Sequence, residues 1–114
     1  MAGKLDIVIE QGADFERQLV WQQADGTPYD LTGYTARMQA RETKLSDTVL
    51  LSITVGAGLT LGGVAGTIDI ELTAAQTQAL EFTTGFWDLE LVSGTGKVYR
   101  LVEGVVTLSQ EVTR

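Results

Sequence analysis

The feature of this sequence that most restricts its fold is a two-residue alternation of apolar and polar side chains, repeated along most of the chain. Successive side chains of a β-strand point to opposite faces of the sheet, so this alternation is typical of strands with one buried face. The alternating stretches are LDIVIE (5–10), DFERQLVW (14–21), GYTARMQA (33–40), GTIDIELT (66–73), FWDLEL (86–91) and VYRLVEGVVTLSQEV (98–112). Two shorter stretches, LLSITV (50–55) and LTLGG (59–63), are also predicted to be strands, which gives seven or eight strands in all.

The alternation also assigns side chains to faces. In the last stretch it places five apolar residues on one face, namely Val98, Val102, Val106, Leu108 and Val112. Trp21 and Trp87 fall on the apolar faces of their strands and are predicted to be core residues. Gly104 lies inside the last strand, and a glycine in that position indicates a bulge or a close approach of another backbone.

Turn and helix signals lie between the strands. Gly26 and the chain's only proline, Pro28, mark a turn, and SGTGK (93–97) is typical of a hairpin loop. The segment LTAAQTQALEF (72–82) lacks alternation and carries helix-forming residues. Thr73 followed three positions later by Gln76 is a capping-box pattern, which predicts a short helix near residues 74–81.

One-sided alternation in nearly every strand requires a second layer to cover the apolar faces. Only one short helix is available, so the second layer must be another sheet. The sequence therefore predicts an all-β fold: an immunoglobulin-like antiparallel β-sandwich of seven to eight strands, with one short helix near residues 74–81. A small barrel is the alternative. The length of 114 residues suits a single domain spanning residues 1–114.

The composition excludes several kinds of chemistry. The chain has no cysteine and no histidine, so Ser-His-Asp and Cys-His catalytic arrangements are impossible. A formal net charge of −7 disfavours binding to the phosphates of nucleic acids. No apolar stretch approaches the roughly 20 residues of a membrane span, and MAGKLDIVIE (1–10) lacks the uncharged core of a signal peptide. We expect no enzymatic activity, no cofactor, and neither nucleic acid nor membrane as a partner.

Four carboxylates are the candidates for a reactive or calcium-binding set, namely Asp69, Glu71, Asp88 and Glu90. The alternation places them on open strand faces and not in a cleft. We therefore interpret them as a solvated sheet surface, paired across strands with Arg37, Arg41 or Arg100. A basic patch on a partner protein is the other interpretation. We predict no catalytic residue and no metal site.

Surface aromatic rings and sheet edges are the remaining candidates for binding. Tyr29, in a turn, and Phe86, on the strand face opposite Trp87, are the expected surface rings, and an exposed ring marks a protein interface more often than a ligand site. A sugar-stacking platform is the alternative. The N-terminal strand LDIVIE pairs either within its own domain or with the sheet of a neighbouring subunit.

Several longer stretches resemble a known family. They are GADF (12–15) with the strand that ends in Trp21, DGTPYDLTGYTARMQAR (25–41), GTIDIELTAAQTQAL (66–80) and GFWDLELVSGTGKVYRLVEGVV (85–106). Over about residues 5–112 the chain resembles the small β-sandwich virion proteins of tailed bacteriophages, among them the N-terminal domains of phage baseplate upper proteins.

The resemblance implies a non-enzymatic structural protein of the virion, assembled in the host bacterial cytoplasm. It would act as a tail, baseplate or fibre-attachment adaptor, with other virion proteins and copies of itself as partners. A capsid decoration (cement) protein is the alternative of the same class, and a carbohydrate-binding β-sandwich module is the alternative of a different class.

Three places are predicted to form protein interfaces. They are the turn with Asp25, Gly26, Thr27 and Tyr29, the hairpin tip with Gly94, Thr95, Gly96 and Lys97, and the N-terminal strand around Leu5 and Ile7.

Overall fold

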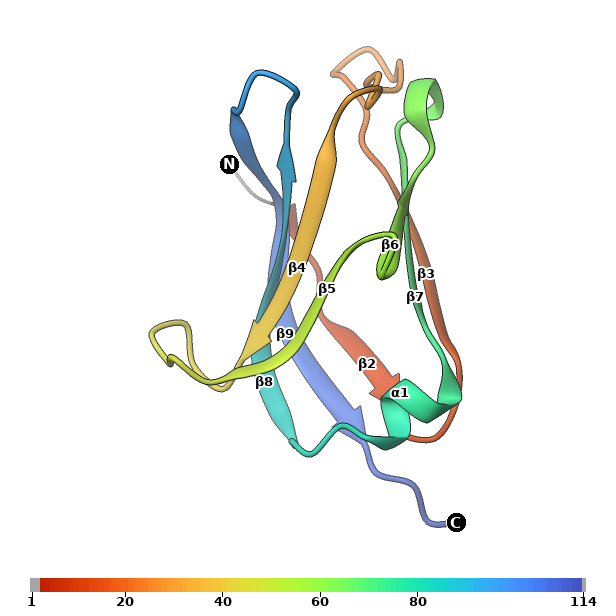
Figure 1. Cartoon of the computed structure of the whole chain (residues 1–114), viewed down its shortest axis with the longest axis vertical. Helices are drawn as coiled ribbons and strands as arrows, with labels where there is room; N and C mark the ends of the chain where they lie inside the picture. The colour runs from red at the N-terminus through yellow and green to blue at the C-terminus, as the bar shows by residue number, and fades with distance from the viewer. Residues whose placement is uncertain (1–2, 114) are drawn as a thin grey trace.

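The computed structural model describes residues 3–113 and contains, over that range, nine strands, one α-helix and one 3-10 helix (Figure 1). The strands are β1 (Gly3–Lys4), β2 (Ile7–Glu10), β3 (Phe15–Val20), β4 (Thr35–Arg41), β5 (Val49–Val55), β6 (Gly58–Leu61), β7 (Thr67–Leu72), β8 (Thr84–Val92) and β9 (Val98–Ser109). Helix α1 spans Ala74–Gln78, and the 3-10 helix spans Gly63–Ala65.

The strands form one curled sheet whose two halves face each other (Figure 1). The order along the sheet is β1-β9-β8-β4-β5-β6-β7-β3, and β2 also pairs with β9. β5 passes from the layer that contains β9, β8 and β4 to the layer that contains β6, β7 and β3 (Figure 1). The prediction of an all-β, immunoglobulin-like β-sandwich with one short helix is confirmed.

Three strand pairings are parallel, although an antiparallel sandwich was expected. β1 and β2 run parallel to β9, and β5 runs parallel to β6 over two residue pairs. β1 and β2 reach β9 from the opposite end of the chain, whereas only Gly56 and Ala57 lie between β5 and β6.

The core lies between the two layers and is built from the faces that the alternation predicts. On β8, Trp87, Leu89 and Leu91 are buried, whereas Phe86 is 39% exposed. The side chains buried most completely are Ile7, Ile9, Leu31, Met38, Leu59, Ile68, Ile70, Leu89, Leu91, Val106 and Thr77. Trp21, also expected in the core, is half-buried at its margin.

A bulge in β9 changes the predicted faces at the start of that strand. Leu89 pairs with Val102, but its neighbour Glu90 pairs with Arg100, so Leu101 is an extra residue in β9. Because an extra residue reverses the alternation, Val98 points outward and is 50% exposed. Its predicted inward position is therefore wrong. Val112, predicted on the same face, lies beyond the end of β9 and is 91% exposed.

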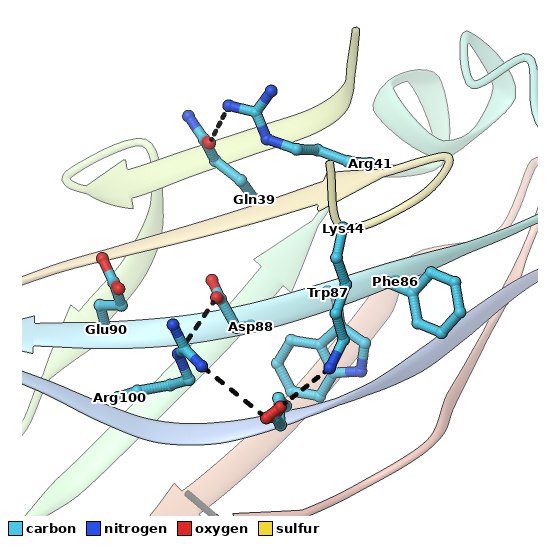
Figure 2. Close-up of a pocket in the computed structure, with 9 residues that line it drawn as sticks. Gln39, Arg41, Lys44, Phe86, Trp87, Asp88, Glu90 and Arg100 are labelled. Carbon is cyan, nitrogen blue, oxygen red and sulfur yellow. Dashed lines mark hydrogen bonds and ion pairs between the residues drawn. The ribbon is translucent and has the colours of Figure 1, made fainter. Parts of the chain in front are cut away.

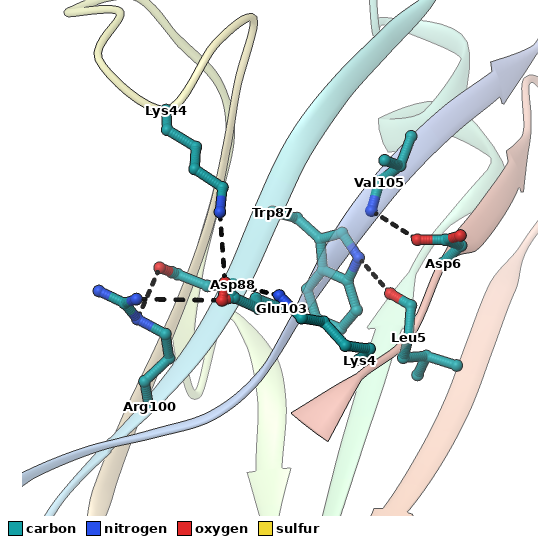
Figure 3. Close-up of polar contacts among 9 residues, drawn as sticks. All are labelled: Lys4, Leu5, Asp6, Lys44, Trp87, Asp88, Arg100, Glu103 and Val105. Atoms are coloured by element: carbon teal, nitrogen blue, oxygen red, sulfur yellow. Dashed lines mark hydrogen bonds and ion pairs between the residues drawn. The ribbon is translucent and has the colours of Figure 1, made fainter. Parts of the chain in front are cut away.

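A close backbone approach at Gly104 fixes the N-terminal strands to the sheet. A Cβ atom at this position would overlap the carbonyl oxygen of Leu5, so the predicted close approach is present. The same oxygen accepts a hydrogen bond from Trp87 Nε1 at 3.0 Å (Figure 3). Asp6 Oδ1 accepts one from the Val105 amide at 2.9 Å. A side chain at residue 104 would therefore displace the segment between β1 and β2.

Helix α1 begins with the predicted capping box. Thr73 Oγ1 accepts from the Gln76 amide at 3.2 Å, and Gln76 Oε1 accepts from the Thr73 amide at 2.8 Å. The helix ends at Gln78, earlier than the predicted residue 81. Ala79 caps the helix, and the chain then turns so that Phe82 is buried in the core.

The segment between β3 and β4 is a corner with two local side-chain turns. Asp25 Oδ1 accepts from the Thr27 amide at 2.9 Å, and this bond lowers the pKa of the Asp25 carboxyl. Asp30 Oδ1 accepts from the Thr32 hydroxyl at 2.6 Å and from its amide at 2.9 Å, which lowers the pKa of Asp30. Gly26 takes a φ of 88°, a conformation that favours glycine.

Candidate functional site

The four carboxylates considered as one set lie on opposite layers. Asp69 and Glu71 belong to β7, whereas Asp88 and Glu90 belong to β8. Each pair is part of the surface of its own layer. Within residues 3–113 no group of three or more carboxylates is placed to hold a metal ion.

The outward side of β4, β8 and β9 carries an ordered array of side chains, which we call the charged face. Its members are Arg37, Gln39 and Arg41 on β4, Phe86, Asp88 and Glu90 on β8, and Arg100, Glu103 and Val105 on β9. Within the charged face the register of β4 and β8 forms three rows, which pair Arg37 with Glu90, Gln39 with Asp88, and Arg41 with Phe86. A fourth outward pair, Thr35 with Val92, lies at the end of the two strands and is not counted in the face.

Two arginines of the charged face pair with carboxylates on β8, as the sequence predicted. Arg37 Nε donates to Glu90 Oε1 at 2.8 Å, and the Arg37 side chain stays 54% exposed. Arg100 Nε lies 3.6 Å from Asp88 Oδ2. Arg41 instead donates to the Ser46 carbonyl and to Gln39 (Figure 2).

Glu103 is the centre of a network that sequence reasoning did not find. The amino groups of Lys4 and Lys44 each lie 3.4 Å from Glu103 Oε1, and Arg100 Nη1 lies 4.0 Å from Oε2 (Figure 3). The hydrogen bond from Lys44 is the main cause that lowers the pKa of Glu103. Arg100 lies three residues before Glu103 on β9, but Lys4 and Lys44 are far from Glu103 in the sequence. The parallel pairing of β1 with β9 and the fold of the loop between β4 and β5 bring these two lysines to it.

Asp88 lies at a hollow of about 260 Å³ in the charged face (Figure 2). Burial and the neighbouring Glu90 carboxylate raise the pKa of Asp88, while Arg100 acts in the opposite direction. The ionised carboxylate is thus incompletely compensated within the chain, and a further positive group at this place would stabilise it.

Exposed apolar side chains border the charged face. Phe86 is 39% exposed and lies beside Val105 in the register of β8 and β9. Val8 on the adjoining β2 is 57% exposed, and Leu45, next to Lys44, is 95% exposed. Exposed apolar side chains gathered in one area are a feature of protein interaction sites.

The charges of the molecule are distributed unevenly. Five of the eight basic residues are members of the charged face or pair with Glu103, and they meet only three acidic residues there; the five are Lys4, Arg37, Arg41, Lys44 and Arg100. The rest of the chain has three basic and twelve acidic residues. The charged face is thus a basic-to-neutral area on a strongly acidic protein.

The outward side of the other layer is acidic. Glu16 on β3 lies directly opposite Glu71 on β7, and Gln18 donates to Asp69 at 2.9 Å in the next outward pair. Like charges in directly opposite positions repel. Arg17 on the edge strand β3 occupies an inward register position among apolar residues, a placement that disfavours pairing with another strand.

Two of the three predicted interface segments lie at one end of the molecule (Figure 1). Asp25, Gly26 and Thr27 are exposed in the corner between β3 and β4, and Tyr29 is half-buried there. The hairpin tip Gly94, Thr95, Gly96 and Lys97 is exposed between β8 and β9. A Cβ atom at Gly94 would lie 3.5 Å from the Gly33 carbonyl oxygen, so the hairpin tip lies beside the chain that leads from the corner into β4.

The third predicted segment pairs within its own domain. β2 pairs with β9, the Ile7 side chain is 1% exposed in the core, and Leu5 is half-buried against the core. Ile7 can therefore offer a partner only its backbone.

An aromatic cluster occupies the corner near Tyr29. Trp21 stacks on Tyr29 with 4.1 Å between ring centres, and it meets Tyr34 edge-on at 6.4 Å and Tyr99 at 5.5 Å. Three rings therefore surround Trp21 and hold the corner against β9. The rings pack against one another and do not form the row of exposed flat faces that a sugar-stacking platform needs.

No family model matches this chain, and no curated protein matches it. Solved structures do match. One is of the extracellular domains of the voltage-gated sodium channel beta4 subunit, described as parallel homodimers with a role in cell–cell adhesion. It is 14% identical to this chain, covers 98% of this chain and 96% of that chain, and has a TM-score of 0.49. A structure from work on the adhesive interactions of such beta subunits is 15% identical, with coverages of 96% and 93% and a TM-score of 0.48. Extracellular domains 3–5 of Drosophila OTK are 14% identical over 97% of this chain and 33% of that chain, with a TM-score of 0.39.

These comparisons contradict the resemblance to phage baseplate proteins. No phage family model matches, and the structures above are extracellular domains of animal proteins. The stretches that carried the resemblance form a corner, strands and a capped helix. Such elements belong to the fold and do not indicate a particular function. The phage adaptor and capsid decoration functions are withdrawn with it, and virion proteins are no longer expected as partners. The virion location that the same resemblance implied stays an untested prediction.

No helix in the described part of the chain is long and apolar enough to cross a membrane.

Proposed function

We propose that the chain is a non-enzymatic protein-binding domain that associates with further copies of itself through the charged face. The observation that carries the proposal is the combination, on one side of one layer, of exposed Phe86 with ion pairs that leave donors unused. A guanidinium has five N–H donors, and Arg37 uses only its Nε toward Glu90.

The charge distribution supports a second copy as the partner. Two acidic molecules repel when their acidic surfaces meet. The charged face has as many basic as acidic residues, and Lys4 and Lys44 beside it give the area an excess of basic ones. At physiological ionic strength, charges more than about 8 Å apart are largely screened. The local charges of the face therefore decide whether two copies can approach.

The available area also suits a dimer. β8 has nine residues, which at about 3.3 Å each gives a length of roughly 30 Å. The five strands β2, β9, β8, β4 and β5 at about 4.8 Å spacing give a width of roughly 24 Å. The product, roughly 700 Å², is close to the roughly 800 Å² that each partner buries in a standard interface. Homodimers are also described for the sodium channel beta4 domains.

Sedimentation velocity at about 0.15 M salt and from about 1 μM to about 1 mM chain tests this function. We expect the sedimentation coefficient to rise with concentration. Phe86→Ser should weaken the association at least about tenfold, because an aromatic side chain at an interface contributes strongly to affinity. Val64→Ser is the control, since Val64 is 73% exposed on the 3-10 helix, away from the charged face. A wild-type chain that is monomeric at every concentration contradicts the function, and an unchanged Phe86→Ser dimer contradicts the choice of face.

A further inference from the structure

We infer that two copies associate face to face about a twofold axis that runs along the strands between β4 and β8. This inference rests on the proposed function and adds the geometry of the contact. It depends on the three rows of the charged face, in which each residue of β4 is paired with a chemically complementary residue of β8.

Rotation by 180° about such an axis places β4 of one copy over β8 of the other and keeps each residue at its own level along the strand. A twofold contact is self-complementary only if each residue meets its complement after this rotation. On this face the row partners exchange places, so every row repeats its own pairing between the two copies.

The first row gives an intermolecular ion pair. Arg37 of one copy lies over Glu90 of the second copy, and the reverse contact occurs on the other side of the axis. Together with the bond of 2.8 Å inside each chain, the four groups form a closed ring of alternating charge. Arg37 is 54% exposed and keeps unused donors for this contact.

The other two rows are also complementary. Gln39 of one copy can donate to Asp88 of the second, where burial and Glu90 leave the carboxylate incompletely compensated. Arg41 lies over the exposed ring of Phe86, an arrangement in which a guanidinium is attracted to an aromatic face. No row places two groups of the same charge over each other.

The sharpest test uses single charge reversals mixed together. In Arg37→Glu, residues 37 and 90 are both acidic, and in Glu90→Arg both are basic. Each variant alone then places like charges over each other across the contact. Its self-association should therefore be at least about tenfold weaker than that of the wild type. In a mixture, the acidic pair of one chain faces the basic pair of the other in both halves of the contact. The mixture should therefore recover association to within about threefold of the wild type.

This recovery is specific for contact between copies, because the ion pair inside each chain stays broken in both variants. Lys97→Glu and Glu71→Arg make the same changes of charge away from the charged face and should leave the association unchanged. Urea unfolding of each variant establishes that it is folded, which is expected because the substituted side chains are accessible to solvent.

A second measurement does not depend on charge. The chain has no cysteine, so Gln39→Cys introduces a single thiol near the axis, and Thr60→Cys introduces one on β6 of the other layer. A short bismaleimide should join two Gln39→Cys chains and not two Thr60→Cys chains.

The outcomes separate the inference from the function. Recovery on mixing together with Gln39→Cys crosslinking supports the twofold geometry. A dimer that Phe86→Ser weakens but whose charge variants do not recover on mixing overturns the geometry and leaves the proposed function intact. A wild-type chain that stays monomeric at every concentration overturns both the twofold geometry and the proposed function, whether or not another protein covers the face.

Discussion

At the scale of single residues, Gly104 is the position where the packing leaves least room. A side chain there would overlap the Leu5 carbonyl, which also accepts the Trp87 indole hydrogen bond. We expect Gly104→Ala to destabilise the domain by at least about 2 kcal/mol, because the backbone between β1 and β2 must move.

Urea unfolding followed by tryptophan fluorescence measures this effect. Gly3→Ala is the matched control in the neighbouring strand, since its Cβ would lie 3.7 Å from the Leu101 carbonyl oxygen, an ordinary contact. Its effect should stay within about 0.5 kcal/mol. Equal stabilities for the two variants would show that the N-terminal segment is not fixed at Gly104.

Asp88 gives the stability a definite dependence on pH. Its pKa is raised in the folded state by burial and by Glu90, so folding favours the protonated carboxyl. Its contribution is therefore most favourable below the unfolded pKa and is lost as the pH rises through the higher folded pKa. The isosteric variant Asp88→Asn removes this titration.

We expect Asp88→Asn to gain stability relative to the wild type between pH 3 and pH 7, by less than about 1 kcal/mol because the site is partly exposed to solvent. Urea midpoints at both pH values, in dilute solution where the chain is monomeric, measure the difference. A relative loss over this interval would mean that the Arg100 contact outweighs burial and Glu90.

At the scale of elements, helix α1 is attached to the segment between β2 and β3 by bonds of Asp14 and Gln11 and by the buried hydroxyl of Thr77. Thr77 Oγ1 donates to the Ala13 carbonyl at 2.8 Å and accepts from the Gly12 amide at 3.0 Å. Thr77→Val keeps the shape of the side chain but removes both bonds and leaves two backbone groups unpaired. We expect a loss of about 1–3 kcal/mol in the free energy of unfolding.

The control for this change is Thr60→Val on β6, where the threonine is exposed and the effect should be near zero. If Thr77→Val were as stable as the wild type, the packing of α1 and not its hydrogen bonds would hold the helix in place.

The elements also show how far the sequence alone could lead. Alternation identifies the inward faces of β4, β7 and β8 correctly because each runs without interruption. It fails at Val98, since the bulge at Leu101 arises from how β8 and β9 fit together and leaves no local signal. Opposite charges on alternating strands predicted that arginines would pair with carboxylates but not which ones, and Arg41 does not pair with one. The Glu103 network needed the strand order. The four stretches of the phage resemblance did not by themselves indicate a function, because the function proposed here depends on how β4, β8 and β9 lie side by side.

At the scale of the whole molecule, the two layers share one core and one continuous sheet. We therefore expect both to unfold in a single transition. Trp21 lies at the corner beside β3 and Trp87 lies on β8, so Trp87→Phe and Trp21→Phe each leave one fluorescent reporter.

In each of these variants the urea midpoint from fluorescence should coincide with the midpoint from far-ultraviolet circular dichroism. The midpoints of the two variants can differ, because each substitution has its own cost. Separate midpoints for the two probes within one variant would show that the layers unfold independently.

The pairing of the first strands with the last one has a consequence for synthesis. Asp6 bonds to Val105, 99 residues further along the chain, and Ile7 and Ile9 find their strand partner only in β9. At about 5–20 residues added per second, a ribosome needs roughly 5–20 s to make the intervening chain. During that interval the nascent chain presents two isoleucines without their partner strand, and folding of the domain can be completed only after β9 has left the exit tunnel.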